Sequence, residues 1–291
     1  MKRPIAAFVL VAANVVAASP ATAQSFSYPD FHDVSHLTLN GDAYKNVPAG
    51  NKLTLTDPTA GQSGSAWSTQ LVHLGSQASF SSVFSFEILD HGGLPGYGID
   101  GADGLTFTLQ NNSNSVGSSG GGIGYYGIPN SVTVEFDTYQ NGEWDDPNSN
   151  HVGINTNGNL FSHVTALEGT LFDNTATWWA WVDYDGVTGN LAVRWAQNAI
   201  RPAAAMLSYD LNIAEILGGG GTPVEDAYVG FTSATGAGWG QHNILSWSFE
   251  DSFDPNGAPL PTTTPEPGSL VLLGTGLVGV LGLRRRKFVK R

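Results

Sequence analysis

The stretch "SVTVEFDTYQNGEWDDPNSNHVGI", residues 131–154, joins a strand pattern to a loop rich in acids, amides and one histidine. Val132, Val134 and Phe136 alternate with polar neighbours, as in an antiparallel strand that packs one face on a core. Glu135 and Asp137 are two residues apart on the same strand, so both project from the opposite face. The stretch therefore predicts a β-strand that carries two carboxylates towards a polar loop.

The same alternation recurs along the chain in residues 79–89, 104–110, 177–195 and 243–250. Residues 177–195 read as a hairpin around Asp185-Gly186. The chain has 37 glycines among its 291 residues and shows no long helical period. These features predict an all-β protein in which antiparallel sheets pack on one core, with no second globular domain and no tandem repeat. The chain contains no cysteine, so it forms no disulfide.

The N-terminus has the order of a secretory signal peptide. Lys2 and Arg3 precede an apolar run from Ala6 to Ala18, and the small residues Ala21-Thr22-Ala23 follow. This order predicts residues 1–23 as a signal peptide that signal peptidase removes before Gln24. An uncleaved N-terminal anchor helix is the alternative, and the run is short for a bilayer.

The C-terminus carries a second targeting pattern. Pro265-Glu266-Pro267 precedes an apolar run from Leu270 to Leu283, and a basic cluster starts at Arg284. Residues 265–291 resemble the PEP-CTERM sorting signal of Gram-negative bacteria, which implies a short transmembrane helix and removal by the membrane peptidase exosortase. A plain tail anchor, with its basic end in the cytoplasm, is the alternative. Residues 253–264 are rich in proline and threonine and predict an extended linker.

The charge is divided unevenly between the ends and the body. Eight of the 12 basic residues lie in the two terminal segments, which leaves four against 24 acidic residues, a net charge of −20, in residues 24–264. Such a surface repels nucleic acid and anionic membranes, so neither is an expected partner. It suits neutral ligands and divalent cations.

The loop after residue 137 has the chemistry of a metal site. Carboxylates, an amide oxygen and a backbone carbonyl suit Ca²⁺. An imidazole added to carboxylates suits a transition ion such as Mn²⁺. Two adjacent ions that share Asp137 and Asp146 fit this donor set, and on residue chemistry alone a solvated acidic loop fits it equally well.

The order of motifs resembles the L-type, or legume-type, lectins. Their Glu-x-Asp strand, Tyr-x-Asn step, Asp-Pro turn and His-Val-Gly-Ile strand appear here at residues 135–137, 139–141, 146–147 and 151–154. The stretches "ADGLTFTLQ", "WAWVDYDGVTGNLAVRW" and "VGFTSATGAGWGQHNILSWSFE" match other signatures of the family. The resemblance implies a lectin domain over residues 24–252, folded as a legume-lectin-like jelly-roll β-sandwich of two antiparallel sheets.

The resemblance also implies a ligand set for two ions. The transition ion, Mn²⁺ in this interpretation, is expected at Glu135, Asp137, Asp146 and His151. The Ca²⁺ ion is expected at Asp137, the Tyr139 carbonyl, Asn141 and Asp146. In this family the ions hold loops that bind a sugar, and they do no chemistry on it.

For the sugar itself, the resemblance implies an acid that follows a cis peptide, here Asp103 in Ala102-Asp103-Gly104. Asn141 is expected to donate its amide and Tyr139 to stack its ring. A backbone N–H is expected from Gly122 or Gly124, between which the alignment does not decide, and for both of which plain turn geometry is the alternative. The specificity loop is expected at Gly236, Ala237, Gly238 and Trp239, where the indole is either a sugar platform or a packed loop aromatic.

A glycoside hydrolase on a related jelly roll is the alternative from another class. Retaining β-glucanases carry Glu-x-Asp-x-x-Glu, and this chain has Gln140 at the last position, which cannot deliver a proton. A matrix or adhesion component with a vestigial lectin site is a third interpretation. We therefore expect no enzyme, but an exported glycan-binding protein of a Gram-negative bacterium, extracellular or at the cell surface after C-terminal processing. Related lectins pair in several ways, so a homo-oligomer is compatible with the sequence.

Overall fold

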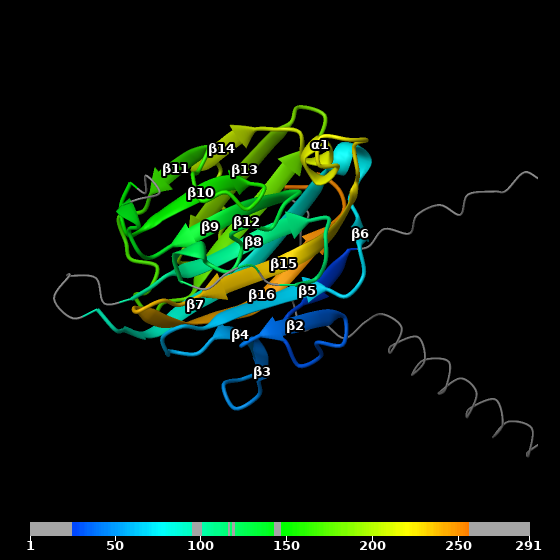
Figure 1. Cartoon of the computed structure of the whole chain (residues 1–291). Helices are drawn as coiled ribbons and strands as arrows, with labels where there is room; N and C mark the ends of the chain where they lie inside the picture. The colour runs from blue at the N-terminus through cyan, green and yellow to red at the C-terminus, as the bar shows by residue number, and fades with distance from the viewer. Residues whose placement is uncertain (1–24, 95–100, 116, 118–119, 143–146, 256–291) are drawn as a thin grey trace, which may run out of the picture.

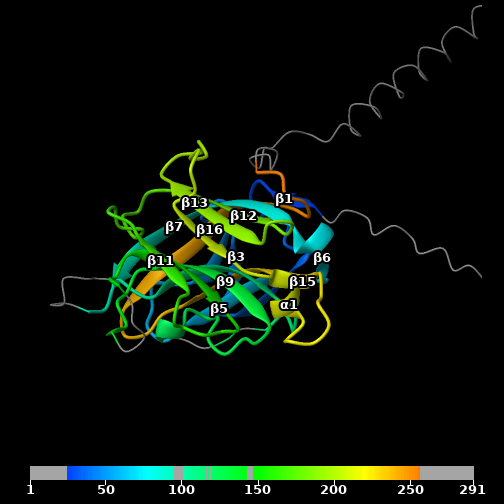
Figure 2. The ribbon, with the colours of Figure 1, turned by 90° about the horizontal axis from the view of Figure 1, so that it is seen from above.

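The structure is a computed structural model, and it describes residues 25–94, 101–115, 117, 120–142 and 147–255. Within these ranges two antiparallel sheets lie face to face, as Figures 1 and 2 show. The signal peptide and the sorting tail expected from the sequence lie outside the described residues. No helix in the described ranges has the length and apolar character needed to cross a membrane.

The back sheet has the order β14-β13-β12-β7-β16-β4-β3, and β1 pairs with β16 at its side. Its strands are β1 (Phe26–Tyr28), β3 (Tyr44–Asn46), β4 (Lys52–Thr56), β7 (Phe80–Gly92), β12 (Trp178–Asp185), β13 (Asn190–Ala196), β14 (Leu207–Asp210) and β16 (Trp239–Glu250). The hairpin expected around Asp185-Gly186 is the β12–β13 pair. All pairings in this sheet are antiparallel.

The front sheet has the order β11-β10-β9-β8-β15-β5-β2, and β6 pairs with β15. Its strands are β2 (Leu37–Gly41), β5 (Ser63–Ser68), β6 (Val72–His73), β8 (Gly104–Gln110), β9 (Ser131–Asp137), β10 (His151–Thr156), β11 (Val164–Leu167) and β15 (Asp226–Ala234). Two 3-10 turns, η1 (Ser76–Ala78) and η2 (Gly120–Gly122), and the short helix α1 (Ile213–Leu217) complete the described elements.

The alternating apolar residues of both sheets meet in one aromatic core. The Phe84 ring of β7 lies 5.8 Å from the Phe107 ring of β8 and 5.0 Å from the Phe231 ring of β15. Phe86 packs 5.1 Å from Phe136 of β9 in the same way. Burial of each such ring is worth about 1.5–3 kcal/mol, so this aromatic layer holds the sheets together.

A second, smaller cluster covers the outer face of the front sheet. Its buried members are Trp67, Ile123, Tyr125, Ile128 and Leu160. Most of them come from the loop between β8 and β9, which folds back over the sheet. The loop is thereby fixed above the front sheet, in which β9 carries Glu135 and Asp137.

Strand β7 spans the molecule from one end to the other. At its first end the Asp254 N–H donates to Oγ of Ser81, which ties down the chain after β16. At its last end Gly92 pairs with Trp239 at the start of β16. The C-terminal segment and the β15–β16 loop therefore lie at opposite ends of the same strand.

Candidate glycan and metal site

The motifs of residues 103–104, 135–137 and 151–154 become neighbours at one end of the front sheet. Asp137, the last residue of β9, pairs with Gly104 of β8 on one side and with His151 of β10 on the other. Strand β15 ends beside them at Ala234, whose carbonyl accepts a hydrogen bond from the Asp103 N–H. The sheet register therefore brings together residues that lie far apart in the sequence.

Glu135 and His151 form the centre of this cluster. The His151 side chain is fully buried, and its Nε2 lies 3.7 Å from Oε1 of Glu135. Nδ1 lies 3.0 Å from the carbonyl oxygen of Asn148, which can only accept, so Nδ1 carries the proton. In the neutral ring Nε2 then presents a lone pair to a carboxylate, and it has no hydrogen-bond partner among the described residues.

This arrangement fits a cation. A histidine that donates Nδ1–H to a backbone carbonyl and presents bare Nε2 is in the form that ligates metals. Two ligand atoms on one ion lie about 3–4 Å apart, which includes the observed separation. Burial raises the pKa of Glu135, yet its pKa lies below the usual value, and the hydrogen bonds from Ser162 and Tyr125 contribute to this lowering.

Gly153 has no side chain, and this leaves the space that the Glu135 carboxylate occupies. A Cβ on Gly153 would lie 2.3 Å from Oε1 of Glu135 and 2.5 Å from Oγ of Ser162. The Ser162 hydroxyl donates to the same Oε1 at 2.7 Å. The glycine of the His-Val-Gly-Ile motif therefore has a steric reason, because any larger residue displaces the carboxylate.

Tyr125 contacts the expected metal ligand Glu135, and the sequence analysis did not identify it. Its hydroxyl donates to Oε2 of Glu135 at 2.7 Å, and the Asn155 side-chain amide donates to the same hydroxyl. Burial and the nearby Glu135 charge raise the pKa of Tyr125 well above its usual value, so the phenol stays protonated. The paired tyrosines in "GGGIGYYG" are the only signal in the sequence, and they show no period that points to Glu135.

The other expected metal ligands follow β9. The Tyr139 N–H donates to Oδ1 of Asp137 at 2.6 Å, which closes a turn directly after the strand. Tyr139 and Asn141 are both partly exposed. Asp146 lies outside the described residues, and within those residues no group of three histidine or acidic side chains comes close enough to hold an ion. The structure thus brings Glu135 and His151 together, and Asp137 lies beside them in register.

Asp103 occupies a buried position where three loops meet. The Ala102–Asp103 peptide is cis, as the resemblance implies. The residue is 3% exposed, and Oδ2 has no hydrogen-bond partner among the described residues. Burial raises the pKa of Asp103 to about 7, and a backbone hydrogen bond from Gly236 opposes the shift.

The glycines named from the sequence lie at different distances from this carboxylate. A Cβ on Gly236 would lie 3.5 Å from both Oδ2 of Asp103 and the Cα of Gly120. Gly124 instead packs on Thr232 and Ser233 of β15. Gly122 is buried, and its carbonyl accepts from two tyrosine N–H groups. Gly120, the first residue of η2, therefore lies beside Gly236, which in turn lies beside Asp103.

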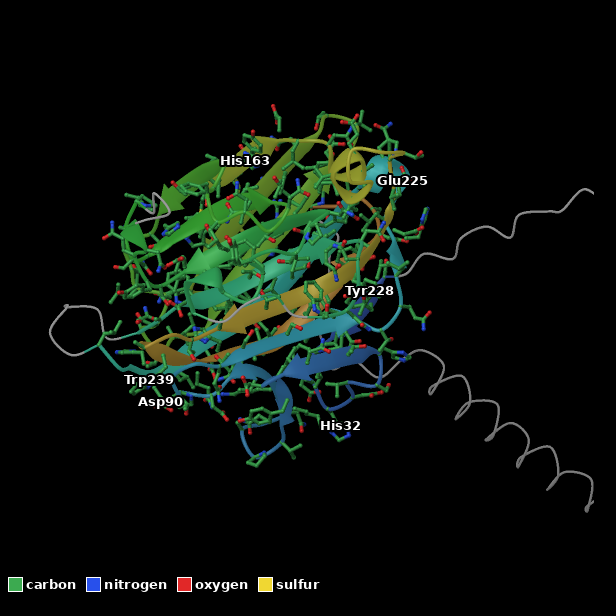
Figure 3. The ribbon with its side chains drawn as sticks, in the orientation of Figure 1. His32, Asp90, His163, Glu225, Tyr228 and Trp239 are labelled. Atoms are coloured by element: carbon green, nitrogen blue, oxygen red, sulfur yellow. The ribbon has the colours of Figure 1, made fainter. Side chains whose placement is uncertain are left out.

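The specificity loop expected from the sequence also lies at this end. Gly238 is buried against Ala102 and Leu94, whereas Ala237 is exposed. Trp239 is partly exposed, and its indole ring lies against the backbone of Gly92 and Gly93 at the end of β7. Figure 3 shows Trp239 beside Asp90 at this end, with Tyr228 and Glu225 towards the other.

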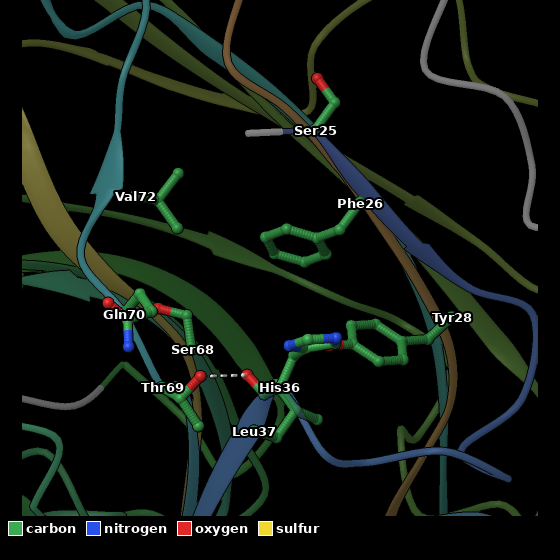
Figure 4. Close-up of a pocket in the computed structure, with 9 residues that line it drawn as sticks. All are labelled: Ser25, Phe26, Tyr28, His36, Leu37, Ser68, Thr69, Gln70 and Val72. Carbon is green, nitrogen blue, oxygen red and sulfur yellow. Dashed lines mark hydrogen bonds between the residues drawn. The ribbon is translucent and has the colours of Figure 1, made fainter. Parts of the chain in front are cut away.

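A separate apolar cavity of 250 Å³ lies at the edge between β1, β2, β5 and β6 (Figure 4). Phe26, Tyr28 and Val72 form its walls. Val72 pairs with Ala227 near the start of β15, whereas Asp103 bonds to Ala234 at its end. Ala227 and Ala234 are seven residues apart on β15, which is about 23 Å along the strand. The cavity is therefore not part of the cluster around Asp103.

Comparisons with known proteins agree with this geometry. The chain is 32% identical over 236 residues to an L-type lectin-domain containing receptor kinase, VIII.1, of Arabidopsis thaliana, covering 76% of this chain and 31% of that one. It therefore spans about a third of the length of that relative. A lectin from Leucomphalos mildbraedii is 29% identical over 245 residues, and the match covers 78% of this chain and 95% of that lectin.

Solved structures share the same architecture. The lectin from Bauhinia forficata in complex with GalNAc superposes with a TM-score of 0.66 at 27% identity, over 79% of this chain and 98% of that chain. Basic winged bean lectin with Tn-antigen superposes with a TM-score of 0.64 at 29% identity, over 78% of this chain and 98% of that chain. Both support the two-sheet jelly roll.

Two family models match the sequence. The PEP-CTERM protein-sorting motif matches residues 263–287, which confirms the interpretation of Pro265-Glu266-Pro267 as part of a sorting signal. The legume lectin domain matches residues 23–265, which include every residue of the cluster described above. The chain therefore belongs to the legume lectin family, with a PEP-CTERM sorting motif at its C-terminal end.

Proposed function

We propose that this protein is an exported lectin that binds a glycan at the loop cluster around Asp103. One observation carries the proposal: Asp103 is a nearly fully buried carboxylate with an oxygen that has no hydrogen-bond partner among the described residues, beside Gly236 and the β8–β9 loop. A buried polar atom of this kind costs free energy unless a partner arrives, and sugar hydroxyls are suitable donors. Asn141, Tyr139 and Trp239 complete the proposed sugar contacts.

The binding is proposed to depend on two metal ions. Glu135, Asp137, Asp146 and His151 would hold a transition ion, Mn²⁺ by donor type, and Asp137, Tyr139, Asn141 and Asp146 would hold Ca²⁺. The bare Nε2 of His151 opposite Glu135 supports the first ion. The ions would neutralise the clustered carboxylates and fix Tyr139 and Asn141 relative to Asp103.

The proposed ligand is a neutral sugar of a polysaccharide or glycoprotein. Similar solved lectins are complexes with GalNAc, Tn-antigen and methyl-α-D-galactose, so galactose-type sugars are the first ligands to test. The hydrolase alternative finds less support, because Gln140 stands where that pattern needs a carboxylic acid.

The proposed export and processing follow from the targeting patterns in the two terminal segments. Residues 1–23 would be removed on export, residues 24–252 would form the lectin domain, and exosortase would remove the tail after a linker at 253–264. The product would be extracellular or at the cell surface. Mass spectrometry of the exported chain in a host with exosortase tests this, and an intact Leu270–Leu283 segment would leave only the tail-anchor alternative.

A glycan array with and without EDTA tests the binding. We expect binding that EDTA abolishes and that Ca²⁺ with Mn²⁺ restores. The Asp103→Asn variant is the matched control, because it should keep the metal ions and lose the glycan. Release of new reducing ends from β-glucans would favour the hydrolase instead, and glycan binding that EDTA does not affect would refute the metal-dependent mechanism.

A further inference from the structure

The body of the chain has only four basic residues, and two of them meet on the outer face of the back sheet. Arg194 on β13 and Arg201 in the loop after it both donate to Oδ2 of Asp183 on β12. Asp183 is 2% exposed, and the side chains of Arg194 and Arg201 are 12% and 20% exposed. In a body with a net charge of −20, half of the basic residues therefore lie side by side at this place.

The two arginines line a cavity of 340 Å³. Ala192 of β13 lies opposite Asp183 in the strand register, and its small side chain leaves the centre of the cavity open. Phe253, 45% exposed, forms another wall from the segment after β16. The hydrogen bond from Asp254 to Ser81 holds this segment in place. The wall residues thus come from four parts of the chain that the fold brings together.

The arginines and aspartates of the cavity do not form separate one-to-one ion pairs. Two guanidinium groups share one oxygen of Asp183, whereas Asp185, which also lines the cavity, pairs with neither, so the formal charges of these four residues cancel. The Nε atoms of both arginines are buried and have no hydrogen-bond partner among the described residues. Asp185, at the rim, accepts hydrogen bonds from Val187 and Thr188 of its own turn. Burial lowers the pKa of Arg194, and the neighbouring charge of Arg201 lowers it further. An added anion would relieve the repulsion between the two arginines.

We propose that this cavity is a second saccharide site, selective for a sugar that carries a carboxylate, such as a hexuronate. The paired guanidinium groups suit a carboxylate, which arginine binds through parallel N–H donors. The Phe253 ring offers an apolar face to a pyranose, and Asn190 lies at the rim. A cavity of 340 Å³ is much larger than a lone inorganic anion needs, which favours a sugar acid. The site lies on the opposite sheet from Asp103 and is independent of it.

Amide chemical shifts test the proposal in the full chain, purified in a non-glycosidic detergent with EDTA present. Titration with D-glucuronate and D-galacturonate should shift the signals of Ala192, Arg201 and Phe253. Glucose, galactose and the methyl esters of both acids should shift them at least tenfold less at equal concentration. An equal response to acetate, or no shift at these residues at 50 mM uronate, would overturn the proposal.

Matched variants then separate this site from the one at Asp103. Arg201→Gln leaves Asp183 paired with Arg194, so the fold should survive while uronate binding weakens at least tenfold. Ala192→Leu should fill the cavity with a similar loss. Lys45→Gln, which removes a basic residue elsewhere, and Asp103→Asn should both leave uronate binding unchanged. If Arg201→Gln binds uronate as the wild type does, or if Asp103→Asn abolishes uronate binding, the cavity is not the site.

Discussion

The Tyr125 hydroxyl donates a 2.7 Å hydrogen bond to Oε2 of Glu135, from the loop that also carries Gly120, which lies beside Gly236 and so near Asp103. The loop that faces the proposed sugar is thereby joined to a proposed metal ligand by one buried contact. Tyr125 anchors the loop by its ring, which packs in the cluster with Trp67 and Ile128, and orients the carboxylate by its hydroxyl.

Tyr125→Phe tests this connection. The ring stays and the loop remains packed, but Glu135 loses a donor that fixes its orientation. Loss of a hydrogen bond that orients a metal ligand typically weakens metal binding about 10–100-fold, so we expect a loss of Mn²⁺ affinity in this range. Titration calorimetry or Mn²⁺ electron paramagnetic resonance measures it. Tyr126→Phe is the control, because Tyr126 is 54% exposed beside it; equal Mn²⁺ affinity in both variants would contradict the role of Tyr125.

Gly153→Ala tests the space beside Glu135. The added methyl would lie 2.3 Å from Oε1, so the carboxylate has to move and His151 loses its fixed neighbour. We expect the transition ion to bind at least tenfold more weakly, with a loss of about 1–3 kcal/mol in stability from overpacking. Metal analysis after dialysis measures the first and denaturant unfolding the second. Gly169→Ala, at an exposed site with nothing within 4 Å of the added atom, should change neither.

Asp103 and Asp137 should separate sugar binding from metal binding. Asp103→Asn removes the charged acceptor, whose hydrogen bonds are worth about 1.5–3 kcal/mol each, so glycan binding is lost while both ions stay bound. Asp137→Ala should release both ions and the glycan, and the sandwich should stay folded because its aromatic core is untouched. Elemental analysis, calorimetry and circular dichroism measure the three properties. Glycan binding by metal-free Asp137→Ala at wild-type affinity would show that the proposed mechanism is wrong.

His242 makes the fold sensitive to acid. It is fully buried beside Thr56, and burial lowers its pKa from 6.5 to about 3, although a backbone hydrogen bond at Gly240 raises it. Between these values the unfolded chain binds the proton and the folded chain does not. The free energy of unfolding therefore falls as the pH drops from about 6.5 towards about 3, by up to about 1.4 kcal/mol per pH unit from this group. Denaturant unfolding in EDTA should show a shallower fall for His242→Gln, and parallel curves would contradict the assignment.

The strands were predictable because their signal is local. Residues 104–110 form β8 as expected, and Val134 and Phe136 point into the core because period-two alternation fixes the face of every residue. The helix α1 was missed because five residues are too few for a helical period. The lectin motifs also named Asp103, Glu135 and His151 as site residues, and their roles in binding stay a prediction.

Tyr125 and the two arginines were not predictable in this way. Tyr125 reaches Glu135 only because the loop after β8 folds back across the front sheet. Arg201 reaches Asp183 only because the loop after β13 crosses the outer face of the back sheet. Such contacts depend on the path of an irregular loop, which no periodic pattern in the sequence encodes.

The length of β7 also separates the C-terminal segment from the loops around Asp103. Ser81, which holds the C-terminal segment, and Gly92, which lies beside Trp239, are eleven residues apart, about 37 Å along an extended strand. A chain tethered through its C-terminal end therefore presents the loops around Asp103 on its distal side. Ligands on a facing cell or particle would meet those loops first, whereas glycans attached to the same surface would have to reach around the sandwich. In a chain tethered in this way, recognition in trans would be favoured over recognition in cis.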